Sequence, residues 1–384
     1  MGKILVGLSG GVDSAVAAYL LKEQGCDVTC AFMRNWDSLT NDDILGNPTL
    51  DEDQCSQEKD WDDAKAAADK LGLELLRIDF IEEYWTNVFE TFLSTYRKGR
   101  TPNPDILCNR YIKFDSFLQF AKDNGFDTLA TGHYAKIGSY HGNTALMKAD
   151  DRNKDQSYFL AEISRTCLDS ILFPLSGISK PEVRRIAEEL GLSIAKKKDS
   201  TGICFIGERK FRQFLSNYLP MKPGKIIDIH GHTVGEHQGV LYYTIGQRKG
   251  LNIGGTGPYY VIGKNVERNE LYVAQTNDES WLYSTSCIVT DVNWLADFEG
   301  PLDLQAKFRY RQPDQDIRLE RIDETTVRAI YPNGIRSVTP GQEAVFYHED
   351  AVIAGGVIDA VFRDEADLAK RIQETVDEGI SHGQ

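Results

Sequence analysis

Apolar and polar positions follow strand-like and helix-like spacing in turn over the first half of the chain. Ile4 begins a short apolar run typical of a buried strand, and residues 12–25 follow with an apolar stripe at helical spacing. Further strands are predicted at 27–33, 73–78 and 128–131, and further helices at 57–71, 84–96 and 110–124. This order predicts an α/β fold over residues 1–210, a doubly wound parallel sheet that binds ligands at the carboxyl ends of its strands.

The pattern changes after residue 210. A short helix is predicted at 210–219, and from Gly224 onward the chain is rich in glycine and short alternating runs. We therefore expect a small β-rich middle domain over 211–280 and a C-terminal β-barrel over 281–384. The barrel strands are predicted at 302–309, 317–322, 326–331 and 351–361, followed by a tail helix at 364–378. The polar stretch 35–56 is interpreted as a surface excursion or mobile loop.

Composition narrows the class of protein. The 384 residues contain no apolar run close to the roughly 20 residues of a membrane span, and no signal peptide is recognised, so we expect a cytoplasmic protein with no membrane partner. The seven cysteines form no C-x-x-C pair, which argues against zinc and iron–sulfur sites, and no residue is predicted to bind a metal directly. The net charge of −15 opposes a nucleic-acid partner, but screening beyond roughly 8 Å means that a local basic patch would suffice.

Residues 4–14 combine a buried strand, a glycine turn and a helix start, which is the geometry of a phosphate cradle. Gly10 and Gly11 let the backbone approach an anion, and Ser9 and Ser14 supply donors, although a glycine pair alone could simply be a tight link. The string Ser-Gly-Gly-Val-Asp-Ser lacks the lysine of the Walker A loop, so γ-phosphoryl transfer is not expected. The string resembles the PP-loop of the ATP pyrophosphatases, which hold the pyrophosphate of ATP and transfer AMP to a substrate oxygen.

A second candidate is the stretch 99–114, in which two prolines stiffen the approach to Cys108. We expect Cys108 close to the start of the next helix, where the positive helix end favours a thiolate. Asp105 could steer the thiol proton or contact a polar substrate. The alternative is that Cys108 is a small buried side chain, which is the commoner state of a free cysteine.

A third candidate is the stretch 196–211, in which Cys204 lies between two glycines in a segment dense with lysine and arginine. Cations stabilise a thiolate or a persulfide anion, and they also suit a polyanion. The competing interpretation is a solvated lysine run beside a core cysteine.

Taken together, the strings at 9–14, 101–109 and 199–207 resemble the bacterial tRNA-specific 2-thiouridylases. The resemblance covers essentially the full length, including 132–134, 154–159, 243–250 and 307–311. Other PP-loop enzymes share the first string but lack the two cysteine segments, so the resemblance is specific.

The resemblance implies a role for each matching position. The phosphates of ATP, with Mg²⁺ on them, would be bound by Gly7, Leu8, Ser9, Gly10, Gly11, Val12, Asp13 and Ser14, with Met33 and Gly132 near the nucleotide. Asn103, Pro104 and Asp105 would hold the target base, and Cys204 would carry a persulfide with Cys108 as its catalytic partner in a transient disulfide. Contacts to tRNA would come from His133, Lys154, Asp155, Gln156, Arg309, Tyr310 and Gln342. Without the resemblance, His133 would be interpreted as a satisfied strand-end histidine and Arg309 and Tyr310 as a solvated face.

The implied activity is ATP-dependent 2-thiolation of the wobble uridine, position 34, in the anticodon arm of tRNA. The uridine C2 oxygen would be adenylated and sulfur would come from Cys204. The implied partners are the lysine, glutamate and glutamine tRNAs and a sulfur donor, either a cysteine desulfurase or a sulfur-relay protein. One alternative is a PP-loop amide ligase that adenylates a carboxylate for attack by ammonia, which a glutaminase domain would favour. The other is a non-catalytic RNA-binding protein, which predicts loss of the Ser and Asp residues of the cradle, and these are intact.

Overall fold

The N-terminal part of the protein is built on a parallel sheet. The computed structural model describes residues 2–45, 47, 56–198, 211–254, 257–297 and 303–382. The sheet has five strands in the order β3-β2-β1-β4-β7. They are β1 (Lys3–Gly7), β2 (Asp27–Arg34), β3 (Glu74–Asp79), β4 (Thr128–Ala130) and β7 (Ile171–Leu172). The order reverses at β1, so the segments that follow β1 and β4 diverge there and leave room for a ligand.

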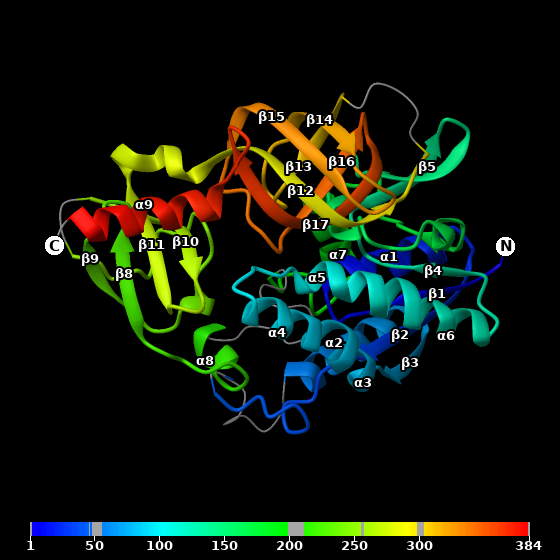
Figure 1. Ribbon diagram of the computed structural model, residues 1–384. Helices are drawn as coiled ribbons and strands as arrows, with labels where there is room; N and C mark the ends of the chain where they lie inside the picture. Colours follow the sequence, from blue (N-terminus) through cyan, green and yellow to red (C-terminus); the bar gives the residue numbers. More distant parts are fainter. Residues whose placement is uncertain are drawn as a thin grey trace.

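Helices cover both faces of this sheet, which confirms the predicted doubly wound α/β fold (Figure 1). Successive strand residues point to opposite faces. Val6 therefore packs with α1 (Val12–Glu23), α2 (Ser56–Leu71) and α7 (Lys180–Glu189), while its neighbour Leu5 packs with the helical residues 81–123. That second layer consists of α3 (Ile81–Tyr84), a π-helical segment (Trp85–Phe89), α4 (Glu90–Arg97), α5 (Pro104–Cys108), a second π-helical segment (Asn109–Ser116) and α6 (Phe117–Asp123).

The predicted start of the helix at residue 110 is wrong, because the helix begins at Pro104. Proline is well tolerated in the first turn of a helix, where its missing N–H has no intrahelical acceptor. Asn103, with an extended backbone, is the residue that precedes the helix. Cys108 is therefore the fifth residue of α5 and lies one turn inside the helix rather than at its first residues.

The C-terminal part is a closed antiparallel barrel, as predicted. Six strands pair in the cycle β12-β15-β14-β13-β16-β17, which returns to β12. They are β12 (Tyr283–Trp294), β13 (Asp303–Lys307), β14 (Gln315–Arg321), β15 (Val327–Arg336), β16 (Glu343–His348) and β17 (Ala351–Arg363), and a short β18 (Ala366–Asp367) pairs with β17.

A hairpin from the N-terminal half joins the sheet of this barrel. Its strands are β5 (Ala135–Tyr140) and β6 (Asn143–Lys148), which follow β4 directly in the chain. Met147 of β6 pairs with Ala351 of β17, and the Lys148 N–H donates to the carbonyl of Asp350 at 2.8 Å. Figure 1 shows β5 at the edge of the barrel, above the helices of the N-terminal sheet. The barrel is thus attached to the N-terminal half by main-chain pairing as well as by side-chain contacts.

A small sheet in the order β10-β11-β8-β9 forms the middle of the chain. It contains β8 (Gly224–Asp228), β9 (Thr233–His237), β10 (Tyr259–Asn265) and β11 (Glu270–Gln275), and it is preceded by α8 (Phe211–Ser216). The tail helix α9 (Leu368–His382) starts four residues later than predicted and lies across this sheet (Figure 1). Its Ile372 and Val376 are buried in the core that the middle sheet shares with the barrel.

The polar stretch after β2 runs at the surface, where Leu39 is 84% exposed, but it is anchored over residues 35–45. Trp36 is 1% exposed, and its Nε1 donates to Asp43 at 3.1 Å. The Tyr218 hydroxyl, just beyond α8, donates to the carbonyl of Asn41 at 2.6 Å. This stretch therefore ties the end of β2 to α8, while most of residues 46–55 lie outside the described part of the chain. None of the helices in the described ranges combines the length and the apolar composition that a membrane crossing requires.

The contact between α9 and the middle sheet generates a stability prediction. Gly231 has a φ of +86°, and a Cβ placed there would lie 2.3 Å from the Ile380 nitrogen of α9. Gly142, in the β5–β6 turn, has a φ of +83° and no atom within 4 Å of such a Cβ. Gly142→Ala should cost only the backbone strain, about 1 kcal/mol. Gly231→Ala should lower the free energy of unfolding by about 2 to 4 kcal/mol, because overpacking adds to the strain.

Urea unfolding of the two variants and the wild type, followed by circular dichroism, measures this difference. An equal loss of unfolding free energy in both variants would contradict close packing of α9 against the turn at Gly231.

Candidate active site

The cradle predicted at residues 7–14 sits where β1 ends and α1 begins. The Ser14 hydroxyl donates to the Gly11 carbonyl at 3.0 Å and accepts from the Ser9 N–H at 3.1 Å. Gly10 has a φ of +73°, and a Cβ there would lie 2.3 Å from the Asp60 carbonyl, so only glycine fits. No side chain caps the N-terminus of α1, which leaves its first N–H groups directed at the cradle. The arrangement suits an anion such as a pyrophosphate.

Asp13 ties the cradle to two distant segments. Both of its carboxylate oxygens lie 2.7 Å from Nζ of Lys180, the first residue of α7. The buried Tyr134 hydroxyl also donates to Asp13 at 2.8 Å. Lys180 is 7% exposed, so a buried cation lies at the mouth of the cradle. Sequence reasoning missed Lys180, although its place in a first helical turn, where the helix dipole disfavours a cation, is a signal that an anion is nearby.

Two further positions expected near the nucleotide lie next to the cradle. A Cβ on Gly132 would lie 2.7 Å from the Ser14 nitrogen, so the segment after β4 touches the start of α1. Met33 is buried on β2, the strand beside β1, and its Cε lies 3.9 Å from the Cβ position of Gly7. The structure therefore brings Gly7, Met33 and Gly132 together around the cradle.

The second predicted group lies on α5. Asn103 precedes the helix, Pro104 begins it, and Asp105 and Cys108 share one face because they are three residues apart. Cys108 is fully buried in the apolar core. A π-helical segment begins at the next residue, and such segments occur often at functional sites. Cys204, its predicted partner, lies outside the described residues, so the predicted transient disulfide stays a prediction.

The barrel holds the segment that leads into α5. Nε2 of Gln342 donates to the carbonyls of Thr101 and Pro102 at 2.9 and 3.4 Å. Arg309 donates to the Ile245 carbonyl at 2.8 Å and to the Thr339 hydroxyl at 2.7 Å. The guanidinium of Arg309 and the amide of Gln342 are thus both used within the protein. In the described structure, these two predicted tRNA contacts position backbone instead of facing outward.

Two more predicted tRNA contacts, Gln156 and Tyr310, lie between the cradle and the barrel. The Tyr134 N–H donates to Gln156 Oε1 at 3.0 Å, and the Gln156 N–H donates to the Tyr134 carbonyl at 2.7 Å. Three residues on, the Phe159 ring lies 4.3 Å from that of Tyr310, and the Phe159 carbonyl accepts from Nδ2 of Asn109 at 2.8 Å. A continuous set of contacts therefore runs from Asp13 through Tyr134 and residues 156–159 to α5 and Tyr310.

Three other predicted contacts have local roles. Asp155 is 4% exposed and accepts from Ala149 and Ser157, and burial raises the pKa of its carboxyl. The backbone N–H of Lys154 donates to the Asp151 carbonyl at 3.0 Å. Burial and the nearby Lys113 charge lower the pKa of His133 well below its usual 6.5, so its imidazole is neutral at neutral pH. A neutral imidazole can accept a hydrogen bond from a base or a hydroxyl.

One lysine of the run at 196–198, Lys197, is used within the protein and is not free to bind a polyanion. Its Nζ lies 2.8 Å from Asp60, 2.6 Å from Asp63 and 3.1 Å from the Gly10 carbonyl. Lys197 therefore connects the cradle to α2, whereas its neighbours Lys196 and Lys198 are exposed.

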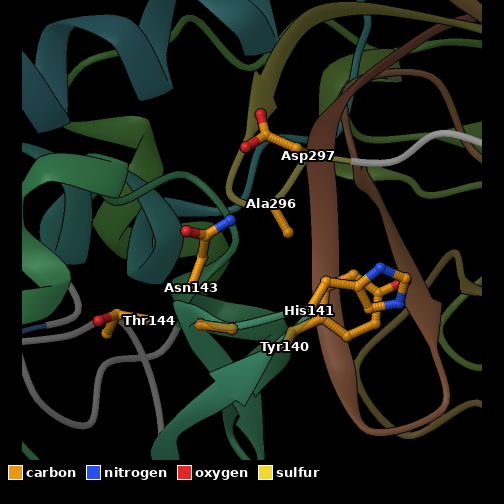
Figure 2. A pocket seen from close by; sticks show the side chains of 7 residues that line it. Tyr140, His141, Asn143, Thr144, Ala296 and Asp297 are labelled. Carbon is orange, nitrogen blue, oxygen red and sulfur yellow. The ribbon is translucent and has the colours of Figure 1, made fainter.

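Two cavities lie away from the cradle. One, of about 240 Å³ at the tip of the β5–β6 hairpin, contains none of the predicted site residues (Figure 2). The other, of about 430 Å³, contains Asp155 and lies between the hairpin and the barrel. It is lined by both signs of charge, and Lys148 pairs there with Asp314 at 2.7 Å. Neither cavity competes with the cradle as the centre of chemistry.

Comparisons with known proteins identify the family. Three family models match in succession: a tRNA methyl transferase HUP domain over residues 2–208, a tRNA methyl transferase PRC-barrel domain over 212–275 and an aminomethyltransferase beta-barrel domain over 284–358. The tRNA-specific 2-thiouridylase MnmA of Mycoplasma capricolum is 52% identical over 94% of this chain and 99% of that protein. The chain belongs to the tRNA-specific 2-thiouridylase family.

Other relatives agree with this assignment, which confirms the resemblance seen in the sequence. The 2-thiouridylase MnmA of Mesoplasma florum is 53% identical over 94% of this chain and 99% of its own length, and that of Shigella flexneri is 49% identical over 93% and 96%. A solved 4-thiouridine synthetase in complex with RNA and ATP aligns with a TM-score of 0.34 and 17% identity over 54% of this chain and 46% of that one. Similarity at that level carries no argument about function.

Within this 2-thiouridylase chain, a buried carboxyl pair lies between α5 and the barrel. Glu162 accepts from Arg110 at 3.1 Å, and burial raises the pKa of its carboxyl. Glu343, the first residue of β16, is 3% exposed, and burial together with Glu162 raises its pKa well above the usual 4.5. Each carboxyl has one oxygen with no hydrogen-bond partner among the described residues. Two adjacent buried charges repel, so the neutral form of Glu343 is favoured.

Glu343→Gln tests this proton. A carboxyl with a pKa raised in the folded state contributes stability at low pH and loses it as the pH rises through the raised value. Glutamine cannot ionise, so the variant should melt at a higher temperature than the wild type at about pH 9 and at a similar temperature at about pH 5. Glu320→Gln, on the exposed face of β14, is the control and should show no such divergence. Parallel melting curves for wild type and Glu343→Gln across this range would contradict a protonated Glu343.

Proposed function

We propose that this chain catalyses the ATP-dependent 2-thiolation of the wobble uridine of tRNA in two chemical stages. The single observation that carries this proposal is identity of about half of all residues to 2-thiouridylases over nearly the whole chain. The geometry supports it, because the phosphate cradle and the cysteine helix α5 are joined by one set of contacts through residues 134 and 156–159.

In the first stage, ATP binds with its pyrophosphate against the cradle. The uridine C2 oxygen attacks the α-phosphorus, so a new C2–O–P bond forms and pyrophosphate leaves as the anhydride bond breaks. The uncapped N–H groups of α1 and the Lys180 cation lie where negative charge accumulates on the leaving pyrophosphate. Mg²⁺ would be held on the phosphates. The described residues contain no group of three or more side chains able to bind a metal without them.

In the second stage, the terminal sulfur of a Cys204 persulfide attacks C2, and AMP leaves with the former C2 oxygen. The Cys108 thiolate then attacks the Cys204 sulfur, so the persulfide S–S bond breaks, its terminal sulfur stays on the base, and a Cys108–Cys204 disulfide forms. The sulfur atom gains two electrons and the two thiols lose two, so a cellular thiol reductant must restore them. Alternatively, Cys108 attacks the persulfide first and releases sulfide, which attacks C2.

The burial of Cys108 adds a requirement to this stage. Its side chain is fully covered in the described structure, so α5 or its cover must move before the thiol can react. The π-helical segment that begins at Asn109 is a natural place for that movement, because its backbone hydrogen bonds are already displaced from the α-helical pattern. The sulfur donor would be a cysteine desulfurase or a relay protein, and the tRNA substrates would be those for lysine, glutamate and glutamine.

Lys180→Met tests the first stage. Removal of the cation leaves Asp13 without its ion pair and the pyrophosphate without one stabilising charge. We expect the rate of tRNA-dependent AMP and pyrophosphate formation to fall about a hundredfold, with partial recovery in Lys180→Arg and unchanged tRNA affinity. Arg185→Met removes an exposed cation from the same helix and should leave the rate within about twofold. Formation of ADP and phosphate by the wild type would overturn the PP-loop assignment.

The two cysteines test the second stage. Cys204→Ser should prevent a protein-bound persulfide from forming, whereas Cys108→Ser should allow it to form and then strand it. Both variants should still bind ATP and tRNA, because neither thiol belongs to the cradle. The measurement is intact-protein mass after incubation with a labelled sulfur donor, followed by 2-thiouridine analysis of the tRNA. Normal thiolation by either variant would rule out this mechanism.

A further inference from the structure

Residues 243–250, Tyr-Thr-Ile-Gly-Gln-Arg-Lys-Gly, form a segment to which no role has been assigned so far. They follow the short 3-10 turn Val240–Tyr242 and lead towards β10. Three cationic side chains from three different elements donate to carbonyls of this segment. Lys264 of β10 reaches Tyr243 at 2.8 Å, Arg309 of the barrel reaches Ile245 at 2.8 Å, and Arg212 of α8 reaches Gly250 at 3.1 Å.

The segment is also held by its own hydrogen bonds. The Thr244 N–H donates to Gln247 Oε1 at 3.1 Å, and Gln247 Nε2 donates to the Lys249 carbonyl at 2.9 Å. Val261 of β10 exchanges two backbone hydrogen bonds with the segment, with Gly246 and Gln247, at 2.7 and 3.0 Å. The backbone of 243–250 is therefore fixed on several sides, and the direction of its outward side chains is set in advance.

Arg248 and Lys249 are the cations that this rigid turn presents. Both side chains are exposed, and neither side chain has a hydrogen bond or an ion pair with any residue that the structure describes, although the Lys249 carbonyl accepts from Gln247 within the segment. Elsewhere on the described surface, arginines such as Arg165 and Arg268 are paired with carboxylates. The chain has 58 acidic and 43 basic residues, so carboxylates are abundant, yet none in the described ranges pairs with this adjacent Arg–Lys pair. A rigid pair of unneutralised cations is suited to an external polyanion.

The turn is attached to the part of the protein that would receive the RNA. Arg309 holds Ile245 and belongs to the barrel loop that continues into Tyr310. The Tyr310 ring lies 4.3 Å from that of Phe159, whose carbonyl is bound by Asn109 next to Cys108. The same contacts that connect the barrel to α5 therefore also fix the position of the turn relative to α5.

We propose that Arg248 and Lys249 form a phosphate-binding element of the middle domain that grips the backbone of tRNA during modification. This inference rests on the proposed function, because it takes tRNA as the polyanion. The proposal gives different roles to the cations of this region. The half-buried Arg309 positions the turn, and the exposed pair makes the contact to RNA. The contact is to phosphates, so it adds affinity and orientation but reads no base.

The test is the salt dependence of tRNA binding by the full-length protein carrying Arg248→Ala and Lys249→Ala together. Each lost phosphate contact should reduce the slope of log affinity against log salt by about 0.9, so the double variant should lose roughly 2. The same slope corresponds to about thirtyfold weaker binding at about 0.15 M salt, with the difference vanishing as the salt approaches 1 M. Each single variant should show about half of the change in slope.

The matched control is Lys222→Ala with Lys225→Ala, which removes two exposed cations from the same domain and changes the net charge equally. It should keep the wild-type slope. An unchanged slope in the Arg248/Lys249 variant, or an equal loss in the control, would overturn the inference.

Thiolation assays separate this inference from the proposed function. The Arg248/Lys249 variant should reach the wild-type rate at saturating tRNA, with the loss confined to kcat/KM. Absence of thiolation by the wild type would overturn the proposed function, and normal thiolation with unchanged binding by the variant would overturn only the inference.

Discussion

A single carboxylate, that of Asp13, is the interaction on which the site depends. It stands in the first turn of α1 and is bound by Lys180 of α7 and by the Tyr134 hydroxyl. These three residues come from the cradle, from the segment after β4 and from a helix some 170 positions further along the chain. The sheet order makes the meeting possible, because the segments after β1 and β4 leave the sheet side by side at the reversal of strand order. An unpaired charge at this half-buried position would be costly, so the pair fixes the geometry around the cradle.

The barrel supports the site by holding backbone. Gln342 holds the carbonyls of the segment before α5, and Arg309 holds the turn of the middle domain. The guanidinium of Arg309 and the amide of Gln342, which the sequence resemblance assigns to tRNA contacts, are used here to fix the positions of neighbouring backbone segments. In both cases a side chain of the barrel fixes backbone that belongs to another domain. Glu343 lies between α5 and the barrel. Burial favours its neutral form, which can be buried without the cost of a charge.

Much of this structure could be predicted from local patterns, and the failures have physical causes. The parallel sheet follows from the strand and helix periodicity, and the cradle follows from the glycine turn after β1. The sequence pattern places the start of α5 too late, because a pair of prolines suggests extended chain although proline also fits a first helical turn. Two ion pairs could not be predicted, because they depend on tertiary contacts that no local pattern encodes. Lys180 pairs with Asp13, and Lys197 pairs with Asp60 and Asp63. The short alternating strands of the barrel are visible in the sequence, but the hairpin that joins the barrel is not, since its partner strand lies about 200 residues away.

The hairpin β5–β6 has a consequence for any attempt to divide the protein. The family models meet between residues 208 and 212, which invites a cut there. Such a cut would leave the hairpin on one fragment and its partner β17 on the other. The cut would remove the Met147–Ala351 pairing and the hydrogen bond from Lys148 to Asp350, so β6 would expose backbone groups that can pair with other chains, while β17 would stay paired with β12 and β16. Fragments separated at this boundary should therefore aggregate or reassociate, and insertion points for tags or fusions belong outside the segment 131–150.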